Sequence, residues 1–312
     1  MPDRVRITDV APRDGLQNEP GSIPTEAKAR LVRALARSGV DEIEVTSFVS
    51  ARSVPQLGDA AELCDMLAAG VPSAATLSAL VPNEKGLEGV LAVNRRAGRV
   101  LLSKVAVFTA ASETFTRRNI NAGIAESIAR FAPVVAGAHG AGLAVRGYIS
   151  CAVACPFEGP IDPWSVAAVA GSLADLGVDE IDLGDTIGAG TRGSVGHMLE
   201  TVMEYLDDSR GWSDASRLTL HLHDTAGHAA DCARAAMEMG LRSFDSAAGG
   251  LGGCPFASTP GRRAPGNIAT STLVRAVRDQ GLRCAVDPER FAECDRVAAE
   301  LAAIARSDGA AP

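Results

Sequence analysis

The chain has 312 residues, of which 46% are hydrophobic and 22% are charged, so it can bury one large core and does not have the composition of a disordered protein. The formal net charge of -8 excludes a broadly basic surface for nucleic acid or an anionic membrane. No apolar run reaches the roughly 18 residues of a membrane-spanning helix. We expect one domain over 1–312, with 281–312 as a C-terminal helical extension, and no nucleic-acid or membrane partner.

Short apolar or β-branched runs alternate with longer amphipathic runs along the chain, and several of the longer runs end at a glycine. This alternation is typical of βαβ units. The predicted strands cover residues 5–9, 42–46, 74–80, 100–107, 144–151, 180–183, 218–223 and 243–247. The predicted helices cover residues 25–38, 57–69, 83–96, 122–139, 163–176, 195–206, 229–239 and 270–279, followed by a final amphipathic run over 288–304. Eight such units predict a (β/α)8 TIM barrel with an additional C-terminal helix.

A doubly wound open sheet would show the same alternation of strands and helices. It would also carry a glycine-rich fingerprint directly after its first strand. Here the first strand is followed by the run 9–16, DVAPRDGL, which places Arg13 and Asp14 where a dinucleotide-binding fold has glycine. The sequence therefore favours the closed barrel.

Seven cysteines are scattered along the chain, without a C-x-x-C pair and without a secretory signal ahead of them. The first apolar run, 5–10, begins almost at Met1 and leaves no room for a cleaved presequence. Reduced thiols and a cytoplasmic location are the simplest interpretation. The cysteines are Cys64, Cys151, Cys155, Cys232, Cys254, Cys284 and Cys294.

Polar residues gather where the predicted strands end. In parallel barrels the active site is built from the C-terminal ends of the strands and the loops that follow them. We therefore take these residues as candidates for the site: Arg13, Asp14, Glu44, Thr46, Ser47, Asp185, Thr186, His221, His223, Asp224, Thr225 and Asn267.

The pair His221 and His223 predicts a metal site. Side chains two apart on a strand point to the same face, so both imidazoles can converge on one ion. Asp14, after the first strand, and Asn267, after the last, become neighbours when the barrel closes. Two nitrogen and two oxygen donors suit Mg²⁺ or Mn²⁺, with Zn²⁺ or Co²⁺ as substitutes. The alternative is a pair of histidines hydrogen-bonded in a packed interior.

Two further residues carry reactive groups. Arg13 stays charged at ordinary pH, and we expect it both to form a salt bridge to Glu44 and to face developing negative charge in the site. Cys254 ends the glycine-rich run 249–254, GGLGGC, whose glycines permit a loop to close over a ligand. Its thiol is a candidate acid, although a cysteine in a loop is more often only structural.

Eight segments in order resemble the 3-hydroxy-3-methylglutaryl-CoA lyase family of barrel metallolyases. They run from the first strand to beyond the eighth, so the resemblance covers nearly the whole chain. The segments are 11–19 APRDGLQNE, 44–50 EVTSFVS, 110–113 AASE, 119–121 NIN, 145–148 VRGY, 184–188 GDTIG, 221–225 HLHDT and 249–254 GGLGGC.

The resemblance implies a divalent-metal-dependent lyase that cleaves a 3-hydroxyacyl-CoA by a retro-Claisen reaction, giving acetyl-CoA and acetoacetate from the usual substrate of the family. It also implies a role for each candidate. Arg13 stabilises the enolate, Cys254 is the loop acid, and Glu44 and Asp185 support the proton transfers. The implied metal ligands are Asp14, His221, His223 and Asn267. His221 is also counted among the catalytic residues.

Other expectations stay open. Arg117 and Arg118 either meet the CoA phosphates or form a solvated charged loop. The segment 256–266 is longer than the family pattern and adds Arg262 and Arg263, and 226–228, AGH, lacks the expected aromatic and amide side chains. Citramalyl-CoA or a longer 3-substituted glutaryl-CoA is therefore an alternative substrate. We expect a homodimer or a larger homo-oligomer.

Two other functions are compatible with the same fold. The first is a condensing synthase of the isopropylmalate synthase type, although such enzymes carry a longer C-terminal region than this chain has. The second is a barrel that has lost its activity. The intact set of Arg13, Asp14, His221 and His223 argues against this, because a polar cluster is costly to keep without a ligand.

Overall fold

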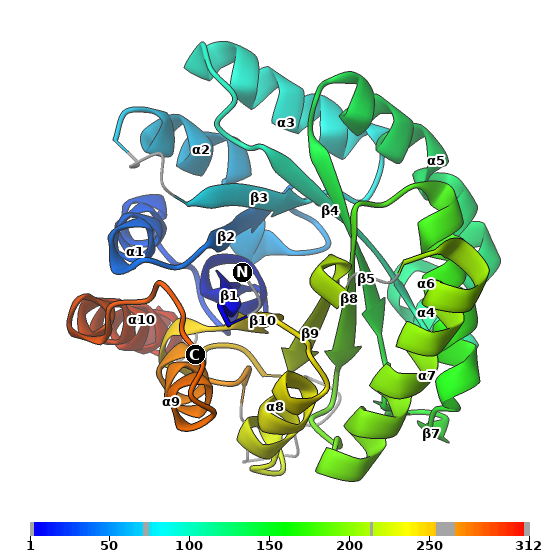
Figure 1. The fold of residues 1–312 in the computed structure, drawn as a ribbon. Helices are drawn as coiled ribbons and strands as arrows, with labels where there is room; N and C mark the ends of the chain where they lie inside the picture. The colour runs from blue at the N-terminus through cyan, green and yellow to red at the C-terminus, as the bar shows by residue number, and fades with distance from the viewer. Residues whose placement is uncertain (1–2, 71–74, 213–214, 254–265, 309–312) are drawn as a thin grey trace.

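The computed structural model describes residues 3–70, 75–212, 215–253 and 266–308, and among these residues eight parallel strands close into a barrel. The helices form an outer ring around the strands (Figure 1). The order around the barrel is the order along the chain, and the last strand pairs with the first. The strands are β1 (Arg6–Asp9), β2 (Glu42–Ser47), β3 (Thr76–Leu80), β4 (Lys104–Ala110), β5 (Ala144–Ser150), β8 (Glu180–Asp185), β9 (Leu218–Leu222) and β10 (Ser243–Ser246). The predicted TIM barrel is confirmed.

Each strand except the last returns to the next through a helix whose apolar face packs on the barrel. A long helix after α9, α10 (Pro288–Asp308), lies beside α1 (Figure 1) and confirms the predicted C-terminal helix. None of the helices in the described ranges is both long and apolar enough to cross a membrane. The outer helices are α1 (Thr25–Ser38), α2 (Ala60–Ala68), α3 (Glu84–Ala97), α5 (Ile124–Gly140), α6 (Pro163–Leu176), α7 (Arg192–Arg210), α8 (Ala229–Glu238) and α9 (Thr270–Asp279).

The fourth strand begins four residues later than the sequence predicts, at Lys104 instead of residue 100. The apolar residues Leu101 and Leu102 read as strand, but their N–H groups donate to the side chain of Asn94, at 3.0 Å and 2.9 Å. Their donors are thus satisfied by the end of α3 and not by a neighbouring strand. The apolar run alone could not reveal this cap.

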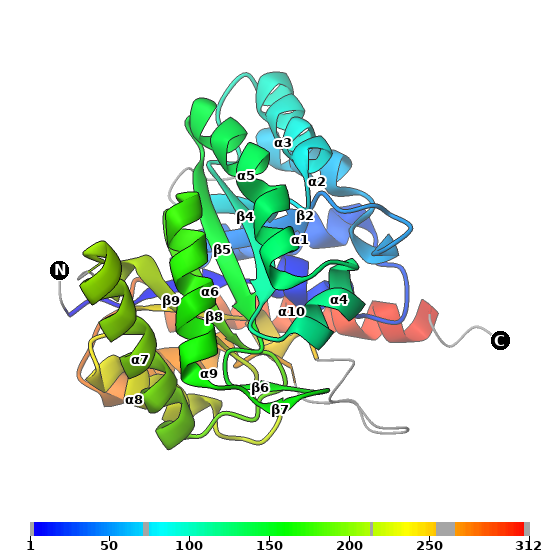
Figure 2. The ribbon, with the colours of Figure 1, turned by 90° about the vertical axis from the view of Figure 1, so that its right-hand side faces the viewer.

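A helix and a hairpin at the rim were not predicted. Helix α4 (Glu113–Ile120) follows β4 and is capped by Ser112, whose hydroxyl accepts the N–H of Phe115. A hairpin of β6 (Ala154–Cys155) and β7 (Gly159–Pro160) follows β5. Both additions lie at the end of the barrel away from the N-terminus (Figure 2). They extend the rim where the C-terminal ends of the strands open.

The interior of the barrel holds an ionic layer. Arg146 of β5, only 2% exposed, donates to Glu180 at 2.7 Å and to Asp245 at 2.8 Å. Lys104 donates to Glu42 at 2.5 Å and to Glu180 at 2.8 Å. TIM-barrel interiors are more often filled by branched apolar side chains. Here both cations have carboxylate partners, which offsets the cost of burying them.

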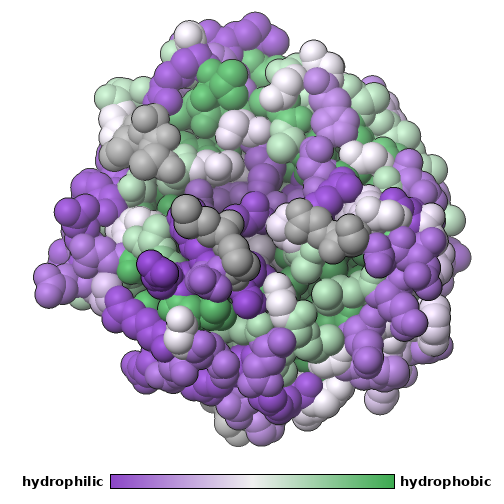
Figure 3. Space-filling model, viewed as in Figure 1, coloured by the Kyte–Doolittle hydropathy of each residue, from purple (hydrophilic) through white to green (hydrophobic). Residues whose placement is uncertain are grey.

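The face seen in Figure 3 carries the N-terminal ends of the strands, and hydrophilic side chains gather at its centre. The ionic layer lies beneath this centre, since Lys104 and Glu42 stand at the beginnings of their strands. A cavity opens at the opposite end of the barrel.

We predict that Asp9 makes the chain less stable as the pH rises. The carboxyl accepts hydrogen bonds from the N–H of Ala11 at 3.0 Å and the hydroxyl of Thr270 at 2.8 Å, but complete burial raises its pKa from 3.8 to about 7. A raised carboxyl pKa gives stability that is fully present below the unfolded-state value and is lost as the pH approaches the folded-state value. Asp9→Asn should therefore gain stability relative to the original chain between pH 5 and pH 8, by about 2 to 3 kcal/mol.

Urea unfolding of both proteins at the two pH values measures this difference. Other buried carboxyl groups titrate identically in the two proteins, so they cancel in the comparison. A difference in unfolding free energy that stays constant between pH 5 and pH 8 would show that Asp9 is ionised throughout.

Candidate active site

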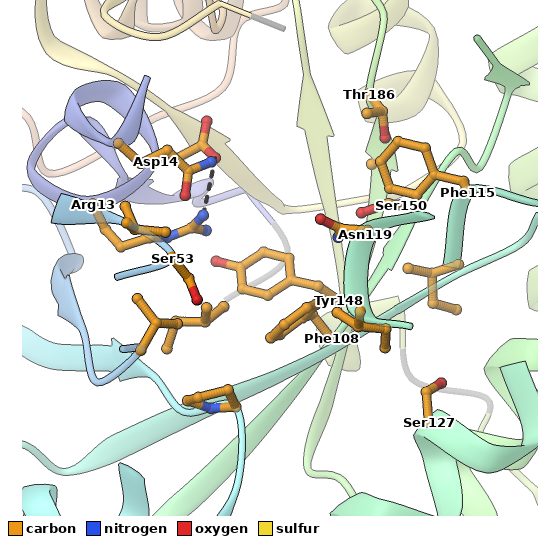
Figure 4. A pocket seen from close by; sticks show the side chains of 18 of the residues that line it. Arg13, Asp14, Ser53, Phe108, Phe115, Asn119, Ser127, Tyr148, Ser150 and Thr186 are labelled. Atoms are coloured by element: carbon orange, nitrogen blue, oxygen red, sulfur yellow. Dashed lines mark hydrogen bonds and ion pairs between the residues drawn. The ribbon is translucent and has the colours of Figure 1, made fainter. Parts of the chain in front are cut away.

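A cavity of about 820 Å³ opens at the C-terminal ends of the strands. Its lining comes from opposite parts of the chain: the turn after β1, the loop after β2, helix α4, and the ends of β5, β8 and β9. Figure 4 shows Arg13 and Asp14 on one side, Phe115 and Thr186 on the other, and Tyr148 between them. The rim predicted from the strand ends is thus a real cavity.

The four predicted metal ligands lie together at this cavity. Asp14 sits in a π-helical turn, Ala11–Gly15, directly after β1, while His221 lies on β9 and His223 just beyond it. The two Nε2 atoms of the histidines are 3.1 Å apart, and Nε2 of His223 is 3.9 Å from Oδ2 of Asp14. Nδ2 of Asn267 donates to the same Oδ2 at 2.9 Å. One cation is within reach of Asp14, His221 and His223, and Asn267 contacts the carboxylate of this group.

The donor atoms fit a divalent cation. Oδ1 of Asn267 is buried and has no hydrogen-bond partner, although its amide nitrogen donates to Asp14 and to the carbonyl of Leu251. A buried acceptor without a partner is costly, and a cation would satisfy it. The two imidazole nitrogens that face each other across 3.1 Å would share the same ion. These are the nitrogen and oxygen donors of a mixed site for a divalent metal.

The electrostatics hold Asp14 and His223 in the forms that bind metal, whereas for His221 the hydrogen bond to Asp245 and the charge of Asp14 outweigh burial and raise the pKa. Burial disfavours the charged form of Asp14, but the guanidinium of Arg13 and the two imidazoles outweigh it and lower the pKa of this carboxyl to about 2. Burial and the neighbouring His221 lower the pKa of His223 to about 4. At neutral pH the site therefore offers a carboxylate and a neutral imidazole, which are the forms that coordinate cations.

Arg13 lines the cavity and is fixed from behind. Its Nε donates to Oε2 of Glu44 at 2.5 Å, its Nη1 donates to Oδ1 of Asp14 at 2.9 Å, and its Cζ lies 5.4 Å from the ring centroid of Tyr148. The salt bridge to Glu44 that the sequence predicted is present. Glu44 itself is 1% exposed and holds the guanidinium without lining the cavity.

Asp185 ends β8 and organises the loop that follows. Its carboxylate accepts the N–H of Ala189 at 3.1 Å and of Gly190 at 2.8 Å, and burial raises its pKa. In this loop Gly188 has a φ of 62°, and a Cβ there would lie 2.8 Å from the carbonyl oxygen of His223. The carboxylate therefore shapes the turn that packs against the end of β9. Its part in proton transfer stays a prediction, as does that of Glu44.

The structure separates Arg117 from Arg118. Arg118 lines the cavity and stacks over Phe157 of the β6–β7 turn, with 4.1 Å between its Cζ and the ring centroid. Arg117 faces away, pairs with Glu113 along α4, and has a side chain that is 69% exposed. Of the two arginines, only Arg118 is placed to meet a ligand in the cavity.

Three predicted residues, Cys254, Arg262 and Arg263, lie outside the described residues. The chain that leads to them reaches the cavity, because Gly253 lines it and its carbonyl accepts a hydrogen bond from Asn18 at 3.2 Å.

No role was predicted for Tyr148, which lies in the middle of the cavity (Figure 4). Its hydroxyl donates to Oδ2 of Asp245 at 3.3 Å. It lies two residues after Arg146 on β5, so the strand alternation that turns Arg146 inward also turns Tyr148 inward. The available signal was the inward position on β5 of a tyrosine, a residue that occurs only twice in the chain.

The family model described as HMGL-like matches residues 4–297. The chain belongs to this family. The match spans all eight strands of the barrel and the beginning of α10, so the family covers the whole barrel. The predicted family is confirmed, and with it the expectation of an enzyme of the carbon–carbon lyase class.

Individual relatives agree with the family. The 3-hydroxy-3-methylglutaryl-CoA lyase of Rattus norvegicus, named cytoplasmic, is 42% identical over 94% of this chain and 80% of its own length. The crystal structure of the HMG-CoA lyase from Brucella melitensis has a TM-score of 0.88 and 42% identity, and covers 96% of this chain and 99% of that one. An HMG-CoA lyase from Acinetobacter baumannii in complex with coenzyme A and 3-methylmalate has a TM-score of 0.85 and 32% identity, and covers 97% and 92% of the two chains.

Proposed function

We propose that this chain cleaves 3-hydroxy-3-methylglutaryl-CoA, or a close 3-hydroxyacyl-CoA, into acetyl-CoA and acetoacetate or the matching keto acid. The observation that supports this is the convergence of Asp14, His221, His223 and Asn267 beside Arg13 at one cavity. The names of the relatives point to the same substrate.

The four ligands would hold Mg²⁺ or Mn²⁺, with Zn²⁺ or Co²⁺ as substitutes. Bound there, the ion would polarise the tertiary hydroxyl and the carboxylate of the substrate and make the hydroxyl more acidic. Arg13 lies next to the ligand Asp14, with its guanidinium fixed by Glu44. It is therefore positioned to stabilise the negative charge that forms on the thioester oxygen when the carbon–carbon bond breaks. Cys254 is proposed to protonate the enolate carbon.

The cavity has a cationic group suited to the anionic parts of coenzyme A. Arg118 is held against Phe157 and presents its guanidinium to the cavity. A planar guanidinium binds phosphate with two parallel hydrogen bonds. The complex of the Acinetobacter baumannii relative with coenzyme A supports an acyl-CoA ligand for this cavity.

We predict that Arg118→Met raises the KM for the acyl-CoA by about tenfold and leaves kcat within about twofold, because a charge-assisted hydrogen bond contributes roughly 1.5 kcal/mol or more to binding. Arg117→Met, next to it on the same helix, is the matched control. It removes an exposed pair with Glu113 and should change neither constant. Equal changes in KM for the two variants would remove Arg118 from the ligand site.

An assay on the purified chain tests the proposed function. The chain is incubated with Mn²⁺ or Mg²⁺ and with 3-hydroxy-3-methylglutaryl-CoA, citramalyl-CoA or longer 3-substituted glutaryl-CoA esters, and acetyl-CoA release is measured with and without EDTA. We expect metal-dependent release from at least one ester. Release from none, together with condensation of acetyl-CoA and a 2-oxo acid, would favour the synthase of the isopropylmalate type.

Two further expectations belong to this proposal. A cytoplasmic location is supported by the cytoplasmic relative of Rattus norvegicus, whereas the relative of Bos taurus is named mitochondrial, so the compartment is to be read from fractionated cells. A homodimer or larger homo-oligomer is to be tested by light scattering on the purified chain.

A further inference from the structure

Asp245 lies directly behind the metal-site histidine. It is on β10, in register with His221 on the neighbouring strand β9, so both side chains point into the barrel at the same level. Oδ2 of Asp245 is 3.2 Å from Nδ1 of His221. This nitrogen is on the side of the ring away from Nε2, the atom that faces His223. The carboxylate and the metal site therefore contact opposite edges of one imidazole.

The carboxylate itself is held firmly. It is 1% exposed and accepts hydrogen bonds from Nη1 of Arg146 at 2.8 Å and from the hydroxyl of Tyr148 at 3.3 Å. The oxygen that faces His221 is thus a fixed acceptor for a ring N–H.

A neutral imidazole carries its proton on one nitrogen only. If Nδ1–H donates to a fixed carboxylate, Nε2 is left with a free lone pair, and the ring cannot turn over without losing the hydrogen bond. Carboxylate partners of this kind orient metal-binding histidines and make the coordinating nitrogen more basic. In the metal site of this chain, such a ring would present Nε2 to the cation at all times.

We propose that Asp245 is a positioning residue: it accepts the Nδ1–H of His221, and with Arg146 behind it, fixes the ring so that Nε2 coordinates the metal. This inference rests on the metal site of the proposed function and adds the group that prepares one of its ligands. A chain of hydrogen bonds would then run from Arg146 in the barrel interior, through Asp245, to His221 at the cavity.

Asp182 provides a matched comparison. It lies in the same interior, is fully buried, and approaches Nη1 of Arg146 at 3.4 Å. Its carboxyl forms a hydrogen bond with that of Asp245. One carboxylate oxygen of each residue and one ring nitrogen of His221 lie within 4.8 Å of one another, which is close enough to bind a second cation. The guanidinium of Arg146, in contact with both carboxyl groups, already supplies positive charge there. We therefore expect one ion for each chain, bound at the rim.

The test compares Mn²⁺ binding by three metal-free proteins, which are the original chain, Asp245→Asn and Asp182→Asn. Binding is measured as the loss of the electron paramagnetic resonance signal of free Mn²⁺. Asp245→Asn should bind Mn²⁺ about 10- to 100-fold more weakly, the usual effect of losing such a partner. Asp182→Asn keeps a donor toward Asp245 in its amide group and should bind within about threefold of the original chain. All three proteins should bind one ion.

Equal weakening in both variants, an unchanged affinity in Asp245→Asn, or two ions bound to each original chain would overturn the inference. If the original chain binds no Mn²⁺, the proposed function fails instead, and the two failures are thereby distinct.

A second measurement reads the protonation of His221 in the original chain, and a variant serves only to assign its signals. In the metal-free original chain, at a pH high enough for the His221 ring to be neutral, ¹⁵N chemical shifts of the ring report which nitrogen carries the proton, with assignment from the spectrum of His221→Gln. The inference requires a proton on Nδ1 and a bare Nε2. A proton on Nε2 would overturn it, whatever the affinities.

Discussion

Replacing Arg13 by methionine is expected to lower kcat by about a hundredfold to a thousandfold, with the KM for the acyl-CoA changed far less. The guanidinium lines the cavity beside the proposed metal ligand Asp14. It is already oriented by Glu44, so it needs no rearrangement when negative charge develops on the thioester oxygen. Losing an interaction that forms only in the transition state lowers kcat and kcat/KM together.

Arg13→Lys is the control for charge alone. An ammonium group keeps the positive charge but cannot donate to Glu44 and Asp14 from one rigid fork. We expect it to recover less than a tenth of the lost activity. Mn²⁺ titration of both variants separates this effect from a damaged metal site. If the activity of Arg13→Met falls only in proportion to the Mn²⁺ that is lost, then Arg13 orients Asp14 for metal binding and does not stabilise the enolate.

Replacing His223 by alanine is expected to abolish metal binding, whereas replacing Cys254 by alanine should leave binding intact and lower turnover. His223 supplies an imidazole 3.1 Å from that of His221, and burial keeps it neutral by lowering its pKa to about 4. Loss of a ligand should exceed the roughly hundredfold weakening seen when only a partner of a ligand is lost. Loss of a general acid costs about a hundredfold or more in kcat.

Bound metal is measured by elemental analysis after dialysis, and turnover by acetyl-CoA release at saturating Mn²⁺. Equal metal loss in the two variants would contradict the acid role of Cys254, because a loop thiol that serves only in proton transfer has no contact with the ion. Full activity in Cys254→Ala would assign the proton to another donor.

The barrel and the convergence of the proposed metal ligands could be predicted because both follow from local rules. Strand alternation and the position of strand ends place His221, His223 and Asp14 at one rim without knowledge of packing. The roles of Asp245 and Tyr148 could not be predicted in this way. Alternation shows that each points inward, but which inward residue touches which depends on the register between β9 and β10 and on the closure of the barrel.

The two arginines of α4 show a second limit. The helix itself was not predicted, so the sequence offered no face on which to divide Arg117 from Arg118. The division depends on Phe157, which the β6–β7 hairpin brings under Arg118 from some 40 residues along the chain. Contacts between segments that follow different strands form only when the barrel has folded, so no local sequence pattern predicts them.

The ionic layer around Arg146 also constrains how the sequence of this barrel can change. Its carboxylates come from β2, β8 and β10, so replacing one member by an apolar residue leaves an uncompensated buried charge on another strand. Removal of one partner from such a pair costs about 3 to 5 kcal/mol, whereas replacement of the whole set by well-packed apolar residues can be neutral. Substitutions at these positions are therefore expected to be tolerated only as a group, and variants of the chain selected for function should exchange them together or keep all of them.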